Sequence, residues 1–230
     1  MIEIVPAIMP DSLKDLKSKM GEVRGLVSTV QIDVMDGVFV PPKTWPYINS
    51  EGFEDIVSGR EDMPFLNELE FEVDLMVSDQ EKEVLDWIKA GARRVVGHVE
   101  AMEDIDRFIK TARDATVPSD SFLSAEVGLS LDINTSVDLL IPHIRDVDFV
   151  QFMGIARIGY QGEEFDERVL ERVSSFRKNF PDLVISVDGG VSEDSASLLI
   201  EAGVNRLVSG SAFFESNDKE EIVKRLSNTA

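Results

Sequence analysis

Two aspartates, distant from each other in the sequence, each end a short apolar run. Asp33 ends the run Val30-Gln31-Ile32-Asp33, and Asp188 ends the run Ile185-Ser186-Val187-Asp188. A parallel α/β protein presents its catalytic groups at the carboxyl ends of its strands. Carboxylates in such positions are suited to general acid and base catalysis. We therefore expect Asp33 and Asp188 to serve one reaction centre.

Other polar or sulfur-containing side chains end further apolar runs. We expect the following to surround the same site: Asp74, His98, Met153 and the turn Ser209-Gly210-Ser211, with Asp36 and Glu100 just beyond. His98 is one of only two histidines, and a hydrogen-bonded structural role suits it as well as a catalytic one.

Glycine turns follow the last two apolar runs. Gly189-Gly190 comes after Asp188, and Gly210-Ser211 comes after Ser209. Glycines let backbone N–H groups approach anionic oxygens, and the N-terminus of a following helix adds a favourable dipole. Loops in these positions of a barrel often bind phosphate. We predict a phosphate site here, with Gly159-Tyr160-Gln161-Gly162 as a third loop, although each turn alone would also fit a simple chain reversal.

Short runs rich in Val, Ile and Leu alternate with amphipathic segments along the chain. The runs predict strands at Glu3–Ile8, Ser28–Asp33, Leu69–Leu75, Arg94–His98, Ser124–Leu131, Asp148–Met153, Leu183–Val187 and Arg206–Ser209. The amphipathic segments predict helices at Leu13–Glu22, Ser50–Ser58, Glu81–Ala90, Ile105–Ala115, Ser136–Ile141, Glu167–Asn179, Asp194–Ala202 and Lys219–Leu226. Ser78, Ser192 and Asn217 are expected to cap helix starts, and Gly91 and Gly203 to follow helix ends.

Eight strand–helix units in 230 residues fit a single (β/α)8 TIM barrel domain spanning residues 1–230. No linker rich in proline or serine separates the units. An open, doubly wound sheet is the alternative architecture.

The composition excludes several function classes. The chain has 44 acidic and 23 basic residues, a net charge of −21 and no cysteine. Nucleic acid and anionic membranes both require a basic face, so neither is an expected partner. No signal peptide or membrane span is evident, which favours a cytoplasmic location. The acidity indicates a solvated acidic exterior, and a saline habitat or a basic partner would also fit it.

Several motifs together resemble ribulose-phosphate 3-epimerases over nearly the full length. The matching segments are Ile32-Asp33-Val34-Met35-Asp36-Gly37 with Phe39-Val40-Pro41, Leu75-Met76-Val77, His98-Val99-Glu100-Ala101, Gly159-Tyr160-Gln161-Gly162-Glu163-Glu164-Phe165, Val187-Asp188-Gly189-Gly190-Val191 and Gly210-Ser211-Ala212-Phe213-Phe214. The resemblance implies a ribulose-phosphate-binding barrel that inverts C3 of a ketopentose 5-phosphate.

In that family one aspartate removes the C3 proton, another returns a proton to the opposite face, and a divalent metal stabilises the enediolate. By position, the resemblance assigns acid and base to Asp33 and Asp188. It places Met35, Met76 and Met153 at the methionines that line the reacting centre, although core packing is an equal alternative for these side chains. Substrate and phosphate contacts are then expected from these methionines and from His98, Gly159, Gly162, Gly189, Gly190, Gly210 and Ser211.

The metal site departs from the family pattern. Gln31 and Asp74 stand where the family has histidine ligands, while Asp33 and Asp188 remain. In one interpretation these four residues, with the Gln31 carbonyl, still bind a metal, and oxygen ligands would favour Mg²⁺ or Mn²⁺ over Zn²⁺. In the other, the metal is lost, the carboxylates repel and at least one stays protonated.

Three further hypotheses concern the altered loops and the function. Arg157 follows the sixth strand, where a cation would offset Glu163 and Glu164 near a phosphate; a surface role fits equally. Related decarboxylases and hexulose-phosphate synthases use Asp-x-Lys at the third strand, but Asp74-Leu75-Met76 has methionine there. A non-catalytic or altered-specificity sugar-phosphate-binding barrel without metal is the alternative function. Barrels of this kind often pair, so a homo-oligomer is compatible with either function.

Overall fold

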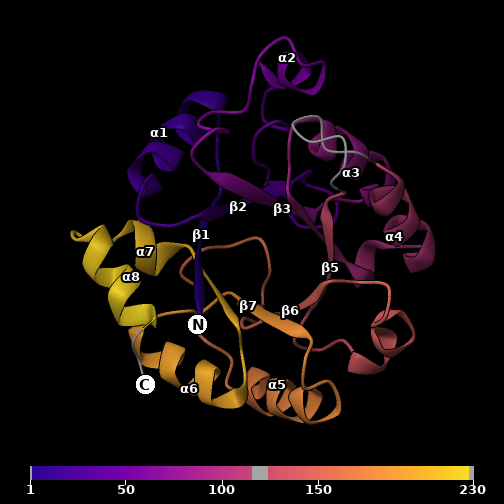
Figure 1. Ribbon diagram of the computed structural model, residues 1–230, viewed down its shortest axis with the longest axis vertical. Coiled ribbons are helices and arrows are strands. Elements are labelled where there is room, and N and C mark those ends of the chain that lie inside the picture. Colours follow the sequence, from indigo (N-terminus) through magenta and orange to yellow (C-terminus); the bar gives the residue numbers. More distant parts are fainter. Residues whose placement is uncertain (1, 116–123, 228–230) are drawn as a thin grey trace.

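The structure is a computed structural model, which describes residues 2–115 and 124–227. Eight parallel strands form a closed barrel in sequence order, each paired with the next and β8 paired with β1 (Figure 1). The strands are β1 (Glu3–Ile8), β2 (Thr29–Met35), β3 (Glu70–Met76), β4 (Arg94–His98), β5 (Glu126–Leu131), β6 (Phe149–Met153), β7 (Val184–Asp188) and β8 (Arg206–Ser209). The predicted (β/α)8 barrel is therefore confirmed.

Helices surround the barrel on its outer face (Figure 1). They are α1 (Leu13–Val23), α2 (Phe53–Val57), α3 (Gln80–Lys89), α4 (Ile105–Asp114), α5 (Arg168–Asn179), α6 (Glu193–Ala202), α7 (Ser211–Phe214) and α8 (Lys219–Ser227). Within the described residues, every helix falls short of the length and apolarity that crossing a membrane requires.

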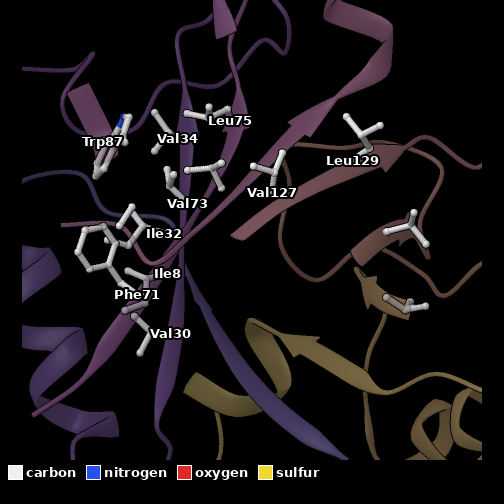
Figure 2. Close-up of a cluster of buried hydrophobic side chains, with 14 of the residues drawn as sticks. Ile8, Val30, Ile32, Val34, Phe71, Val73, Leu75, Trp87, Val127 and Leu129 are labelled. Atoms are coloured by element: carbon white, nitrogen blue, oxygen red, sulfur yellow. The ribbon is translucent and has the colours of Figure 1, made fainter. Parts of the chain in front are cut away.

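Alternation along each strand separates an apolar exterior from a polar lumen. Val30, Ile32 and Val34 of β2 join the large hydrophobic cluster between the strands and the helices, together with Phe71, Val73, Leu75 and Trp87 (Figure 2). Because side chains of a strand point alternately to opposite faces, the intervening Gln31, Asp33 and Met35 face the barrel interior. One apolar face thus anchors β2 and fixes which residues reach the site.

The predicted element boundaries differ from the observed ones mainly at their ends. Two helix caps are shifted by one residue: Asp79, rather than Ser78, caps α3, and the Asp218 carboxylate, rather than Asn217, accepts the N–H of Glu221 near the start of α8. The predicted cap at Ser192 is confirmed, as are positive φ angles at Gly91 and Gly203.

Two local predictions are wrong. The helix predicted at Ser136–Ile141 is replaced by two 3-10 turns, Val137–Leu139 and Ile141–His143. Pro142 lies near the start of the second turn, where its missing N–H and fixed φ fit a new tight turn and oppose a continuous helix. Helix α7 was not predicted, because only four residues separate Gly210 from Glu215. The one-domain prediction for residues 1–230 includes residues 1, 116–123 and 228–230, which lie outside the described residues.

Candidate active site

Three carboxylates meet inside the carboxyl end of the barrel. Asp33 pairs laterally with Asp74 on β3, and Asp188 on β7 pairs with Met153 on β6. One oxygen from each of Asp33, Asp74 and Asp188 lies within 4.8 Å of the others. Their exposed fractions are only 6%, 0% and 8%. The residues are 155 positions apart at the extremes (188 − 33), so only closure of the barrel unites them.

Gln31 connects the two aspartates that the resemblance assigned as acid and base. Its amide nitrogen Nε2 donates to Asp33 Oδ1 over 2.8 Å and to Asp188 Oδ2 over 2.7 Å. The side chain is fully buried, and its carbonyl oxygen Oε1 accepts no hydrogen bond from the described residues. One amide group therefore bridges the pair.

Asp74 is held by different partners. His98 Nε2 lies 2.9 Å from Asp74 Oδ1, and Gln151 Nε2 donates to Asp74 Oδ2 over 3.3 Å. All three side chains are buried. His98 therefore orients a carboxylate of the cluster, which is the hydrogen-bonded structural role considered for it.

Burial and mutual repulsion shift the ionisation of the cluster. Desolvation, followed by the charges of Asp188 and Asp74, raises the pKa of Asp33 well above its ordinary value. Desolvation and the charge of Asp74 raise the pKa of Asp188 to about 7, against the hydrogen bond from Gln31. Burial lowers the pKa of His98, but the Asp74 carboxylate outweighs this effect and the pKa is raised. At neutral pH the aspartate pair can therefore hold a proton.

A cavity with about 490 Å³ of space free of atoms opens above the cluster, and Asp33 and Asp188 both line it. Predicted contact residues that also line it are Met76, Met153, Gly159, Gly162, Gly189, Gly190, Gly210 and Ser211. Four predicted site residues, Gln31, Met35, Asp74 and His98, do not line this cavity and are buried. Met35 packs against Met76 and Val40.

The glycine turns after β7 and β8 require glycine for both backbone and space. Gly190 has φ +68°, and a Cβ there would lie 2.7 Å from Phe165 Cα. A Cβ on Gly210 would lie 2.6 Å from Gln161 Nε2. No backbone hydrogen bond among the described residues uses the N–H of Gly190 or Gly210. These donors on the cavity wall are therefore available to an anion.

The loop between β6 and α5 closes one side of the cavity. Gln161 Nε2 donates to the backbone oxygen of Ala7 on β1, over 3.1 Å. Arg157 pairs with Glu163 through both of its donor groups and lies over the Tyr160 ring at 5.0 Å. Glu163 and Tyr160 line the cavity, whereas Arg157 is exposed and does not. Arg157 thus offsets the Glu163 charge, as hypothesised, from outside the cavity.

Sequence reasoning missed several residues that support the site. Gln151 lies two positions before Met153 on β6, so strand alternation would have placed both in the lumen. The Thr44 hydroxyl donates to the Asp33 backbone oxygen over 2.8 Å and accepts the Met35 N–H. Asp36 accepts hydrogen bonds from Val38 and Phe39, and from the backbone and hydroxyl of Ser78. No sequence pattern marked these loop contacts.

The donor set fits a divalent metal ion. Asp33, Asp74 and Asp188 each offer a carboxylate oxygen, and these oxygens lie close enough together to share one ion. The unpartnered Gln31 Oε1 is a fourth oxygen, which would reach the ion only after rotation of the amide. Hard cations prefer such oxygen ligands.

Comparisons with known proteins agree with this architecture. The model of the ribulose-phosphate 3 epimerase family matches residues 3–214. The ribulose-phosphate 3-epimerase of Bacillus subtilis is 29% identical, and the match covers 98% of each chain. The chloroplastic ribulose-5-phosphate-3-epimerase of Arabidopsis thaliana is 31% identical, covering 94% of this chain and 74% of that protein.

Solved structures share the fold at lower identity. The 3-hexulose-6-phosphate synthase of Salmonella typhimurium superimposes with a TM-score of 0.67 at 16% identity, covering 99% of this chain and 98% of that one. At this identity the likeness shows the barrel alone. The family match extends from β1 to α7 and so includes every strand that carries a carboxylate of the cluster. The chain therefore belongs to the ribulose-phosphate 3 epimerase family of isomerases.

Proposed function

We propose that this protein interconverts the C3 epimers of a ketose phosphate of the ribulose 5-phosphate and xylulose 5-phosphate type. The observation that supports this most directly is the placement of Asp33 and Asp188. They come from separate strands, lie within 4.8 Å of each other and line one cavity with the glycine turns. Inversion at carbon requires an acid and a base on opposite faces, which two such carboxylates supply.

Asp33 and Asp188 divide the two proton transfers. Gln31 occupies Oδ1 of Asp33 and Oδ2 of Asp188, so each carboxylate keeps its second oxygen for the reacting carbon. Since the pKa of Asp188 is raised to about 7 and that of Asp33 is raised as well, the pair carries a proton under neutral conditions. One member then acts as acid while the other acts as base, and the roles exchange in the reverse direction.

We further propose Mg²⁺ or Mn²⁺, in preference to Zn²⁺, as the metal held by Asp33, Asp74, Asp188 and the Gln31 carbonyl. Oxygen-only ligation favours these ions. When bound, such an ion supplies Lewis-acid stabilisation of the negative charge that develops on the substrate oxygens. His98 and Gln151 keep the Asp74 carboxylate in place by hydrogen bonds.

Substrate phosphate is assigned to the turns at Gly189-Gly190 and Gly210-Ser211, with Gly159 and Gly162 on the opposing loop. The available N–H groups of the first two turns support this assignment. A protein of the same fold, KGPDC from Streptococcus mutans, was solved in complex with ribose 5-phosphate. Met76 and Met153 line the cavity between the turns and the carboxylates and form the apolar wall beside the reacting carbon. Met35 supports Met76 from behind.

One observation favours a second candidate, a sugar-phosphate-binding barrel without catalysis. The family's metal-ligating histidine position holds Gln31, whose amide donates to the carboxylates instead of accepting a cation. Calorimetry with ribulose 5-phosphate, together with NMR detection of xylulose 5-phosphate in the presence of Mg²⁺ or Mn²⁺, separates the two. Conversion supports the epimerase, whereas tight binding without conversion under any metal condition contradicts it.

A further inference from the structure

The amide of Gln31 is placed where it can serve only one kind of partner. Its nitrogen lies 2.8 Å from one carboxylate oxygen and 2.7 Å from another, and these oxygens belong to strands β2 and β7. A primary amide has two N–H donors and a carbonyl acceptor. In the opposite orientation, the carbonyl oxygen would face two carboxylate oxygens, and nothing would offset the repulsion. The donor orientation is therefore the favourable one between Asp33 and Asp188.

The bridge also opposes the electrostatic problem of the cluster. Three buried carboxylates within 4.8 Å repel one another strongly in a low-dielectric interior. The hydrogen bonds from Gln31 lower the pKa of both Asp33 and Asp188, against burial and mutual repulsion. Hydrogen bonds to charged groups contribute about 1.5–3 kcal/mol each. Gln31 thus supplies part of the positive potential that a cation would supply.

We propose that Gln31 is a positioning residue that bridges Asp33 and Asp188 when no metal is bound, and that a metal ion must displace this amide to enter. The inference rests on the proposed function, because it concerns the same acid–base pair. It departs from a simple ligand role: the bridge competes with the metal, whereas a ligand would assist it. Removing the amide therefore strengthens metal binding if Gln31 is a bridge and weakens binding if it is a ligand.

The test compares the wild type with Gln31→Met and with the control Gln151→Met. Methionine has a similar volume but no strong donor, and its soft sulfur is a poor ligand for Mn²⁺. Gln151 is equally buried in the lumen, yet it donates only to Asp74 and bridges no pair. Each protein is treated with EDTA, melted, and titrated with MnCl₂ alone by calorimetry and by thermal shift.

We expect Gln31→Met to bind Mn²⁺ about tenfold more tightly than the wild type, since entry no longer breaks two hydrogen bonds to charged groups. Its EDTA-treated form melts at a lower temperature than EDTA-treated Gln151→Met, and Mn²⁺ raises its melting temperature more than that of the wild type. Weaker Mn²⁺ binding by Gln31→Met than by the wild type would overturn the bridge and make Gln31 a ligand, while leaving the metal-assisted epimerase intact.

If no protein responds to Mn²⁺, the metal part of the proposed function fails, and the metal-free melting temperatures decide the bridge. A Gln31→Met variant as stable as Gln151→Met would then refute it. A second measurement uses the wild type and so does not depend on variant folding. With ¹⁵N-glutamine labelling, the Gln31 side-chain N–H₂ should exchange slowly in the EDTA-treated protein and lose that protection in saturating Mg²⁺. A rapidly exchanging Gln31 amide without metal would also overturn the proposal.

Discussion

At the residue scale, the site consists of carboxylates that repel one another and amides that compensate for them. The positions of Asp33, Asp74 and Asp188 at strand ends were predictable, because apolar alternation marks where each strand ends and which side chains face inward. The bridging role of Gln31 was not predictable. It depends on the barrel bringing Asp188 from β7 across to β2, and that contact spans 157 residues.

The first prediction concerns pH and Asp188. Its pKa rises from the ordinary 3.8 to about 7 in the folded state, so in this range the folded protein binds a proton that the unfolded chain releases. The free energy of unfolding of the metal-free protein should therefore fall as the pH rises from 3.8 to about 7. Urea unfolding at a series of pH values in EDTA measures this slope.

Asp188→Asn should flatten the slope, because the titrating group is gone and the repulsion on Asp33 is relieved. The control Asp55→Asn changes an exposed carboxylate outside the cluster and should keep the wild-type slope. An Asp188→Asn protein with an unchanged slope would show that the folded structure does not bind this proton.

At the element scale, the turns after β7 and β8 convert strand ends into an anion site. Gly190 has a positive φ and a neighbouring backbone too close for any side chain, whereas Gly59 has φ +72° and open space around it. These two glycines therefore separate the effect of φ from the effect of the close approach.

We predict that Gly190→Ala raises the KM for the sugar phosphate by roughly tenfold or more, since loss of a charged hydrogen bond alone costs about 1.5–3 kcal/mol. The Phe165 backbone would force the turn out of position. Gly59→Ala should show a comparable φ penalty of about 1–2 kcal/mol in stability and an unchanged KM. Steady-state kinetics and thermal melts measure both. Equal KM values for the two variants would remove this turn from the phosphate site.

The loop between β6 and α5 provides a second element-scale prediction. Arg157→Ala leaves the Glu163 carboxylate on the cavity wall without its cation, so an anionic substrate should bind more weakly. Because the pair is exposed, we expect only a roughly two- to threefold rise in KM at low salt, and less at high salt. The double variant Arg157→Ala/Glu163→Gln should restore the wild-type KM. A single variant with unchanged KM at low salt would contradict this role.

The sequence predicted the strands more closely than the helix starts. Strand positions follow from buried apolar runs, and the bounds of β1, β4 and β8 agree with prediction. Cap choice depends on a local competition between neighbouring polar residues: Asp79 prevails over Ser78, and Asp218 over Asn217. The four-residue helix α7 has too few positions to show a helical period, although it begins directly beyond a predicted phosphate turn.

At the scale of the whole molecule, the charge of −21 is the dominant feature. Self-repulsion among like charges destabilises the compact state, and salt screens it. We predict that raising NaCl from about 10 mM to about 1 M near neutral pH increases the melting temperature by roughly 3 °C or more. The same salt series near the sequence pI of about 4.4, where the net charge vanishes, should give a much smaller increase. Equal salt effects at the two pH values would contradict this explanation.

Closure of eight units into one barrel was predictable, because the repeated alternation of apolar runs and amphipathic segments admits few architectures. The loop contacts that complete the site were not, since they depend on three-dimensional neighbours: Gln161 with Ala7, Thr44 with Asp33, and Asp36 with Ser78.

The central claim is that Asp33 and Asp188 exchange protons with opposite faces of one carbon. The most direct measurement is NMR of ribulose 5-phosphate incubated with the protein in deuterated water, with Mg²⁺, Mn²⁺ or Zn²⁺. The wild type should place deuterium at C3 and form xylulose 5-phosphate, and Asp33→Asn and Asp188→Asn should each reduce net epimerisation by about 10²–10⁴-fold. Absence of C3 deuterium under every metal condition, or wild-type rates in both variants, would contradict the claim.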